Sequence, residues 1–287
     1  MNTTTHEKRC AVIRCLVDGC SIRAITRITG VAKNTIQKLT RELGEAVMQY
    51  QNNVLRNLKC QRVQCDEIWC FCYAKDKNLP PIMRNQPGIG SIWTWTALCA
   101  DTKLLFSWHF GNRDATNAYE FIKDIQGRLA NRVQLTTDSL PAYFPAVLDS
   151  FAEVDYAMLK KLYGKAETGP ESRYSPPKCN GTKKKVVMGN PDPAHISTSY
   201  MERQNLNFRM NNRRYTRLTN AFSKKADMLA YSFAITAMYH NFVRIHQTLK
   251  STPAMKAGVT DHLWSIEEMV DLLPEVSCQS RTKKVST

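Results

Sequence analysis

Apolar side chains recur every three to four residues through the first part of the chain, which is the period of an α-helix. The pattern predicts three helices, over residues 7–18, 22–28 and 32–43. Ser21 is suited to cap the start of the second helix, and Gly30 is suited to the tight turn that follows it. Two helices joined by such a turn indicate a helix-turn-helix.

The side chains that point outward from the third predicted helix are polar or basic. They are Lys33, Asn34, Gln37 and Arg41, with Lys38 close by. Amide side chains can pair with adenine, and basic side chains with guanine or phosphate. We therefore expect residues 1–48 to form a DNA-binding domain whose recognition helix enters a major groove, followed by a helical linker over 49–60. The alternative is a small helical hairpin that makes contacts between subunits.

From residue 61 the pattern changes to runs rich in β-branched and aromatic residues, which predict strands. Five strands are expected, over 62–74, 91–100, 103–110, 133–138 and 154–159. Helical periodicity returns over 114–130 and 141–151, between the later strands. Strands alternating with helices predict an α/β fold with a mixed five-stranded sheet.

The last third of the chain mixes loop and helical patterns. Residues 164–195 are rich in glycine and proline and predict a loop insertion that carries a small hairpin at 186–188. Its lysines, Lys183, Lys184 and Lys185, either hold a phosphate backbone or form a solvated charge run. A long helix is expected over 220–249, which closes a domain spanning 61–250. Residues 251–287 would add a short helix and a basic, disordered tail from Arg281 to Lys284.

The charge balance narrows the class of partner. Forty lysines and arginines against 25 acidic residues give a net charge of +15 and a pI of about 9.4. Such an excess favours nucleic acid as a partner. No apolar run reaches the length of about 18 residues that a membrane span needs, and the first ten residues lack the apolar core of a secretory signal. We expect a cytoplasmic, nucleoid-associated prokaryotic protein whose ten cysteines are free thiols rather than zinc ligands.

Three acidic residues stand where chemistry is expected. Asp66 lies inside an apolar strand, where a carboxylate needs a partner or a metal ion. Asp138 ends the fourth strand, and carboxyl ends of strands collect ligands in α/β sheets. Glu202 lies on a helix predicted over 195–210. Two acids from adjacent strands and one from a later helix give the order expected of a ribonuclease-H-like core, in which oxygen ligands suit Mg²⁺ or Mn²⁺.

The helix around Glu202 has two contrasting faces. Glu202, Asn205 and Arg209 share one stripe, which suits metal-assisted phosphate chemistry. The other face carries Tyr200, Leu206 and Met210, which we expect to be buried. Glu67, the neighbour of Asp66, is expected to point to the opposite side of its strand.

Several segments resemble one known family. CDEIW (65–69), TTD (136–138), ERQNLNFRMNNRRYTRLTNAFSKK (202–225) and YHNFVRIHQTLKSTPAMKAGV (239–259) are similar to DDE transposases of the insertion-sequence-one type. The resemblance covers nearly the whole chain and is to a longer, single-frame branch with its own helix-turn-helix. In this resemblance Asp66, Asp138 and Glu202 match the catalytic, metal-binding triad. Asn205 matches the ExxN pattern, and Arg209 matches the basic residue seven positions after the glutamate.

The resemblance implies an enzyme that cleaves and joins DNA strands at the terminal inverted repeats of an insertion sequence. It implies two Mg²⁺ or Mn²⁺ ions per active site, double-stranded element ends and target DNA as partners, and a homodimer or higher oligomer. The chain departs from the family in having Ser139-Leu140 after the second aspartate, where glycine is usual. Two alternatives remain open: a metal-dependent nuclease on the same core, and a retired transposase that acts as a DNA-binding regulator.

Overall fold

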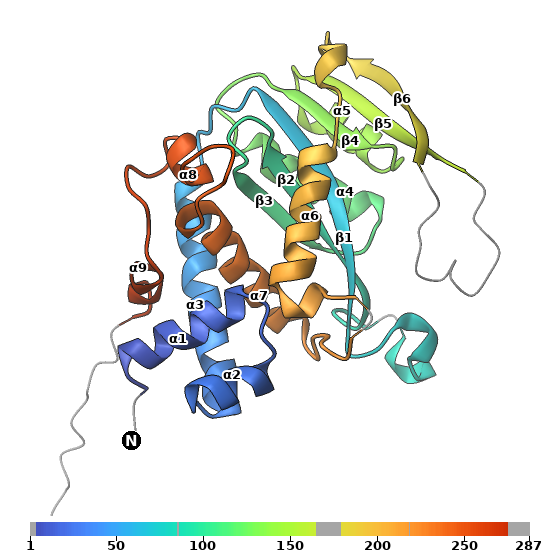
Figure 1. Ribbon diagram of the computed structural model, residues 1–287. Coiled ribbons are helices and arrows are strands. Elements are labelled where there is room, and N and C mark those ends of the chain that lie inside the picture. Colours follow the sequence, from blue (N-terminus) through green and yellow to red (C-terminus); the bar gives the residue numbers. More distant parts are fainter. Residues whose placement is uncertain (1–3, 85, 165–178, 218, 275–287) are drawn as a thin grey trace, which may run out of the picture.

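The computed structural model describes residues 4–84, 86–164, 179–217 and 219–274 (Figure 1). Their elements in chain order are α1 (His6–Val17), α2 (Ile22–Thr29), α3 (Lys33–Val54), β1 (Arg62–Cys72), β2 (Gly90–Cys99), β3 (Leu105–Gly111), α4 (Ala115–Gln126), β4 (Gln134–Asp138), α5 (Tyr143–Ser150), β5 (Asp155–Tyr163), β6 (Cys179–Met188), α6 (Ser199–Asn211), α7 (Ala226–Met238), α8 (Pro253–Lys256) and α9 (Ile266–Asp271). Part of the expected insertion, 165–178, and the tail with Arg281–Lys284 lie outside the described residues.

The strands form one mixed sheet in the order β3-β2-β1-β4-β5-β6. β1 pairs in parallel with β4, and β4 pairs in parallel with β5, whereas the other neighbours are antiparallel. The predicted ribonuclease-H-like α/β core is therefore present, but its sheet has six strands and not five. The sixth, β6, comes from the expected insertion, in which residues 179–188 pair with a β5 that extends to Tyr163.

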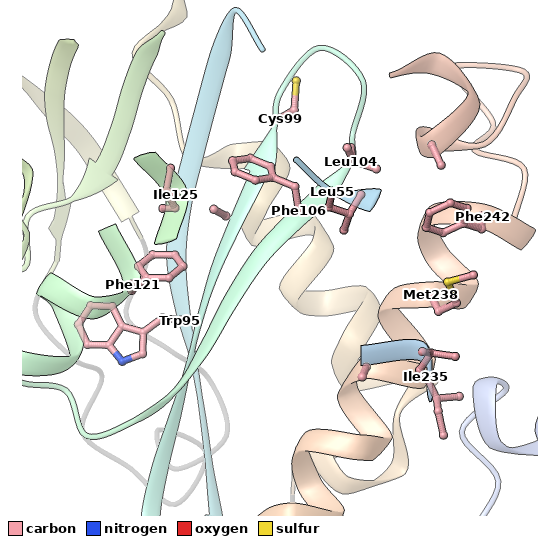
Figure 2. Packing of buried hydrophobic residues seen from close by; sticks show 14 of the residues in the cluster. Leu55, Trp95, Cys99, Leu104, Phe106, Phe121, Ile125, Ile235, Met238 and Phe242 are labelled. Carbon is pink, nitrogen blue, oxygen red and sulfur yellow. The ribbon is translucent and has the colours of Figure 1, made fainter. Parts of the chain in front are cut away.

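Helices cover both faces of the sheet because β1 and β2 bury apolar side chains on each side. Ile68 and Cys70 of β1 belong to a cluster with Met201 and Phe208 of α6 and Phe233 of α7. On the other face, Trp95 of β2 packs edge-to-face against Tyr143 of α5. Phe121 of α4 lies next to the same tryptophan (Figure 2). The sheet is thus the middle layer of three.

The helix-turn-helix geometry follows the sequence signals. The Ser21 hydroxyl accepts a hydrogen bond from the Ala24 amide at 3.2 Å, and Gly30 ends α2 with φ +70°. A Cβ at Gly30 would meet nothing within 4 Å, so the glycine is there for its backbone conformation alone. α3 then continues without a break to Val54, through the segment expected to begin a helical linker.

α3 lies directly against α7. A Cβ at Gly44 would come within 2.3 Å of the Cβ of Tyr231, so the two helices touch at a position that admits only glycine. Gln51 donates a hydrogen bond to the Ala234 carbonyl at 3.2 Å. The apolar cluster that holds Ile13 and Ile36 also includes residues of the sheet, and the first three helices therefore share a core with it.

The predicted helix over 220–249 is wrong at both ends. Ser223 forms an isolated bridge with Cys72 of β1, which holds that segment extended before α7 begins. After Met238 a π-helical turn runs through Tyr239–Val243, where the Asn241 side chain bonds both the amide and the carbonyl of Leu105, at 3.0 and 2.7 Å. Among the described helices, none is long and apolar enough to cross a membrane.

Candidate metal-binding and nucleic-acid site

The strand register brings two of the predicted acids to the same level of the sheet. Gln64 of β1 lies opposite Thr136 of β4, and both strands run in the same direction. Asp66 and Asp138 each follow two residues later, so they lie side by side where β4 ends. β1 continues beyond this point to Cys72.

Asp66 points toward α6. Its Oδ2 accepts a hydrogen bond from the Asn205 side-chain amide at 2.8 Å. Burial, together with the charges of Asp138 and Glu202, raises the pKa of Asp66 to about 6 against the opposing effect of hydrogen bonds from the Glu67 backbone and Asn205. Asp66 is therefore a carboxylate that neutral donors stabilise and two neighbouring acids oppose.

Glu67 is a buried acid that belongs to the site, although sequence reasoning left it out. It does point to the other face of β1, where Tyr143 of α5 donates its hydroxyl proton to Oε1 and Arg113 donates to Oε2 at 3.0 Å. Burial raises the pKa of Glu67 to about 7, and the Asp138 charge adds to this rise. The sequence signal that could have found it is a second acid directly after Asp66 in an apolar strand.

Asp138 is held from two sides. Its Oδ2 accepts a hydrogen bond from Arg113 at 3.1 Å, and its Oδ1 accepts one from the Leu140 amide at 2.8 Å. A backbone amide of the Ser139-Leu140 segment, of a kind that glycine would also supply, thus orients the second aspartate. Arg113, which bridges Asp138 and Glu67, had no sequence signal of its own.

Three carboxylates form a group that could hold a metal ion. One oxygen from each of Asp66, Glu67 and Asp138 lies within 4.8 Å of the other two. Carboxylate oxygens are the ligands that Mg²⁺ and Mn²⁺ prefer. Burial, with the charges of neighbouring acids, raises the pKa of Asp66 and of Glu67. The donor set fits a hard divalent cation.

Glu202 lies near this group but is engaged elsewhere. Its carboxylate forms an ion pair with Lys161 of β5 and accepts a hydrogen bond from the Thr198 hydroxyl. Its charge still contributes to the raised pKa of Asp66. The third predicted acid is therefore close to the first two, with a lysine paired to it.

Asn205 and Arg209 follow Glu202 along α6, as predicted. Asn205 is buried, and its Oδ1 has no hydrogen-bond partner among the described residues. The same holds for Nη1 of Arg209. Burial lowers the pKa of Arg209, with the Arg217 charge adding to the effect and Asp66 opposing it. Both side chains carry unused polar atoms beside the acids.

The side of α6 that was predicted to be buried is exposed. Tyr200, Leu206 and Met210 were expected to be buried, but they are 47%, 44% and 62% exposed. The prediction is wrong because α6 turns its polar stripe with Met201 and Phe208 toward the sheet, where Asp66 receives Asn205. The covered face therefore combines apolar Met201 and Phe208 with Asn205, the polar partner of a buried acid.

The other predicted DNA-binding residues lie on two separate surfaces. Lys33, Asn34, Lys38 and Arg41 are exposed along the first half of α3, and Gln37 is half-exposed. Lys183, Lys184 and Lys185 are exposed on β6, the last strand of the sheet. The position of the second group is shown in Figure 1, where β6 lies at the far side of the sheet from α3.

Comparisons with known proteins return little. No family model matches the chain, and no curated protein matches it. Among solved structures, it is similar to a piggyBac transposase synaptic complex with hairpin DNA, at a TM-score of 0.36 and 11% identity, over 95% of this chain and 71% of that chain.

Proposed function

We propose that the chain is a DDE-type DNA transposase of the insertion-sequence-one kind. The observation that carries the proposal is the convergence of Asp66 and Asp138 from adjacent strands with a helix that presents Glu202, Asn205 and Arg209. The net charge of +15 supports a polyanionic substrate. The substrates would be double-stranded element ends and target DNA.

In this proposal Asp66, Asp138 and Glu202 would hold two Mg²⁺ or Mn²⁺ ions. Such a pair, about 3.5–4 Å apart, activates a water or a 3′-hydroxyl and stabilises the leaving oxygen. Asn205 keeps the Asp66 carboxylate oriented through its 2.8 Å hydrogen bond. The Leu140 amide does the same for Asp138.

The cationic side chains have two tasks. Arg209 offers an unpaired Nη1 beside Asp66, where a phosphate of the cleaved strand would lie. Arg113 pairs with Glu67 and Asp138, and Lys161 pairs with Glu202. With divalent cations held by the acids, both side chains would be available to contact the phosphate backbone of the DNA.

The regions outside this site would bind and assemble. Residues 1–48 would read the element ends through Lys33, Asn34, Gln37, Lys38 and Arg41. Lys183–Lys185 of β6 would hold a phosphate backbone. Because two ends must be joined, we propose a dimer or higher oligomer that forms on DNA.

The test uses the DNA that flanks the gene, incubated with the full chain and Mg²⁺. Wild type should nick and join strands at the inverted repeats, and Asp138→Ala should bind the same DNA without cleaving it. Cleavage by Asp138→Ala at the wild-type rate would refute the site. Glu202→Gln and Glu67→Gln, compared in the same assay, identify the third ligand.

One observation favours a second candidate, a DNA-binding regulator without catalysis. Arg113 already pairs with Glu67 and Asp138, and Lys161 with Glu202, so the acids have partners in the protein itself. Titration with Mn²⁺ separates the two: the transposase gains thermal stability on metal binding, which Asp66→Asn removes. A regulator shows no gain in either protein.

A further inference from the structure

A cavity of about 640 Å³ lies next to the second half of β1. β4 pairs with β1 only at Arg62–Gln64, so β1 continues past the acids without that neighbour. The space beside it is closed by the loop after β1 and by the segment after α6. None of this space was predicted from the sequence.

One wall of the cavity is aromatic. Trp69 and Phe71 lie on the same side of β1, with ring centroids 5.8 Å apart, and Phe222 lies 4.9 Å from Phe71. The Trp69 indole is fixed by its hydrogen bond to Ser91 Oγ at 3.0 Å. Three rings in sequence, half-exposed and held in place, form a surface on which flat groups can stack.

Cationic side chains also line the cavity. Lys75 lies 5.7 Å from the centre of the Phe71 ring, and Arg214 and Arg217 belong to the same lining. Arg214 donates to Ser223 Oγ at 2.7 Å, and burial lowers the pKa of its guanidinium. No carboxylate lines the cavity, and within the described residues these three cations form no ion pair. The cavity therefore favours an anion.

The cavity lies beyond the acidic group along β1. Trp69 comes three residues after Asp66, about 10 Å further along the strand and on the face that carries Glu67. The lining also includes Cys70, which shares the face of Asp66, so the cavity is lined from both faces at the edge of β1 that β4 leaves unpaired. A strand held at the acids would reach the rings within a few nucleotides.

We propose that this aromatic–basic cavity binds unpaired nucleotides of the DNA strand next to the phosphate that is cleaved. The bases stack on Trp69, Phe71 and Phe222, and Lys75, Arg214 and Arg217 hold the phosphates. The identity of the strand as DNA rests on the proposed function. The preference for unpaired nucleotides rests on the cavity.

The stacking of bases within a duplex favours unpaired DNA as the ligand of this cavity. In a duplex each base covers the faces of its neighbours, and a ring inside a cavity cannot reach them. An unpaired base offers a free face to aromatic side chains, whatever its sequence. An acidic peptide would pair with the cationic side chains of the cavity but would not need the three aromatic rings.

The experiment measures binding by the full chain in EDTA, so that no cleavage occurs. The probes are a blunt fluorescent duplex and the same duplex with a short unpaired 3′ overhang, in which one base is 2-aminopurine. Wild type should bind the overhang duplex more tightly and quench the 2-aminopurine by stacking. Trp69→Ala and Phe222→Ala should each weaken overhang binding about tenfold and leave blunt binding unchanged.

Matched controls separate stacking from folding and from charge. Trp69→Phe keeps a ring and should retain overhang binding, as should Tyr163→Ala, which removes an exposed ring from β5. Arg217→Ala should reduce the salt dependence of overhang binding. Equal losses on both duplexes in Trp69→Ala and Phe222→Ala, with unfolding curves like wild type, would overturn the proposal.

The outcome is distinct from that for the proposed function. Asp138→Ala should lose cleavage and keep the overhang preference. A wild-type protein that cleaves the flanking DNA but binds both duplexes equally refutes the cavity and leaves the transposase standing. A protein that prefers overhangs through Trp69 yet cleaves nothing supports the cavity and refutes the transposase.

Discussion

The two faces of β1 place neighbouring carboxylates in different surroundings. On the α6 face, Asp66 has neutral donors only, the Asn205 side-chain amide among them, and unpaired polar atoms around it. On the α5 face, Glu67 has two donors, the Tyr143 hydroxyl and the Arg113 guanidinium. Glu67, with a cation and a hydroxyl on its two oxygens, supports its neighbours, whereas Asp66, with no cation bonded to it, is available to a metal ion. Proximity alone does not distinguish these roles.

The largest expected effect is a difference in strand cleavage between variants of Asp66 and Glu67, which lie on the two faces of β1. Asp66→Asn should reduce strand cleavage about a thousandfold or more, because loss of a metal ligand removes several kcal/mol of transition-state stabilisation. Glu67→Gln, which keeps an acceptor for Tyr143, should reduce it no more than about tenfold. Single-turnover cleavage rates provide the measurement. Equal losses of cleavage rate in Asp66→Asn and Glu67→Gln would show that the two carboxylates have the same role.

The second effect is a loss of stability with rising pH in the metal-free protein. Burial raises the pKa of Asp66 to about 6 and that of Glu67 to about 7, above the values of about 3.9 and 4.3 in an unfolded chain. The folded state therefore binds more protons in this range. Its advantage from these groups is full below about pH 4 and is lost as pH rises through the folded pKa values.

We expect this loss to be on the order of 3 kcal/mol between pH 5 and pH 8. Urea unfolding measures it as the difference between wild type and the double variant Asp66→Asn/Glu67→Gln, in which both groups no longer titrate. Mg²⁺ at pH 8 should restore much of the wild-type stability. If the difference in unfolding free energy between the two proteins does not vary with pH, the pKa values of the two acids are not raised in the folded state.

Tyr143→Phe tests the α5 face alone. The change removes the donor to Glu67 and leaves a buried acceptor with less compensation, which should cost about 1–3 kcal/mol of unfolding free energy. Tyr119→Phe, on the exposed side of α4, is the matched control and should change little. A neutral result for Tyr143→Phe would mean that Arg113 suffices to hold Glu67.

The smallest effect is expected from Lys161→Ala, which releases Glu202 on the α6 face. The pair is partly exposed, so stability should change by less than about 1 kcal/mol. The Mn²⁺ concentration needed for half-saturation should nevertheless fall, because Glu202 becomes free to bind. Lys160→Ala, an exposed neighbour, is the control. Unchanged Mn²⁺ binding would place Glu202 outside the metal site.

Much of the fold could be predicted because local signals agree with the final packing. Ser21 and Gly30 fix the ends of α2, and the strand ending on Asp138 is correct to the residue. The sixth strand could not be predicted, since β6 is an edge strand whose exposed lysines hide the alternation of a buried one.

The site was predictable only in part, for a different reason. Asp66 and Asp138 could be placed together because parallel strands align their carboxyl ends. Glu67 could not, because alternation along one strand says nothing of how close the end of the next strand comes. The face of α6 was misassigned for a related reason: Asn205 is covered together with Met201 and Phe208 because it bonds Asp66, and the helix sequence does not reveal that partner.

Because α3 is one uninterrupted helix, it fixes the distance between its exposed first turn and its contact with α7. Its 22 residues span about 33 Å, from the exposed Lys33 to the contact of Gly44 with Tyr231 and on to Val54. A duplex gripped at the tip of this rod could not swing independently of the sheet. The protein would then fix the distance between the DNA sequence that α3 contacts and the bond that is cleaved. Base pairs inserted between these two points would prevent cleavage.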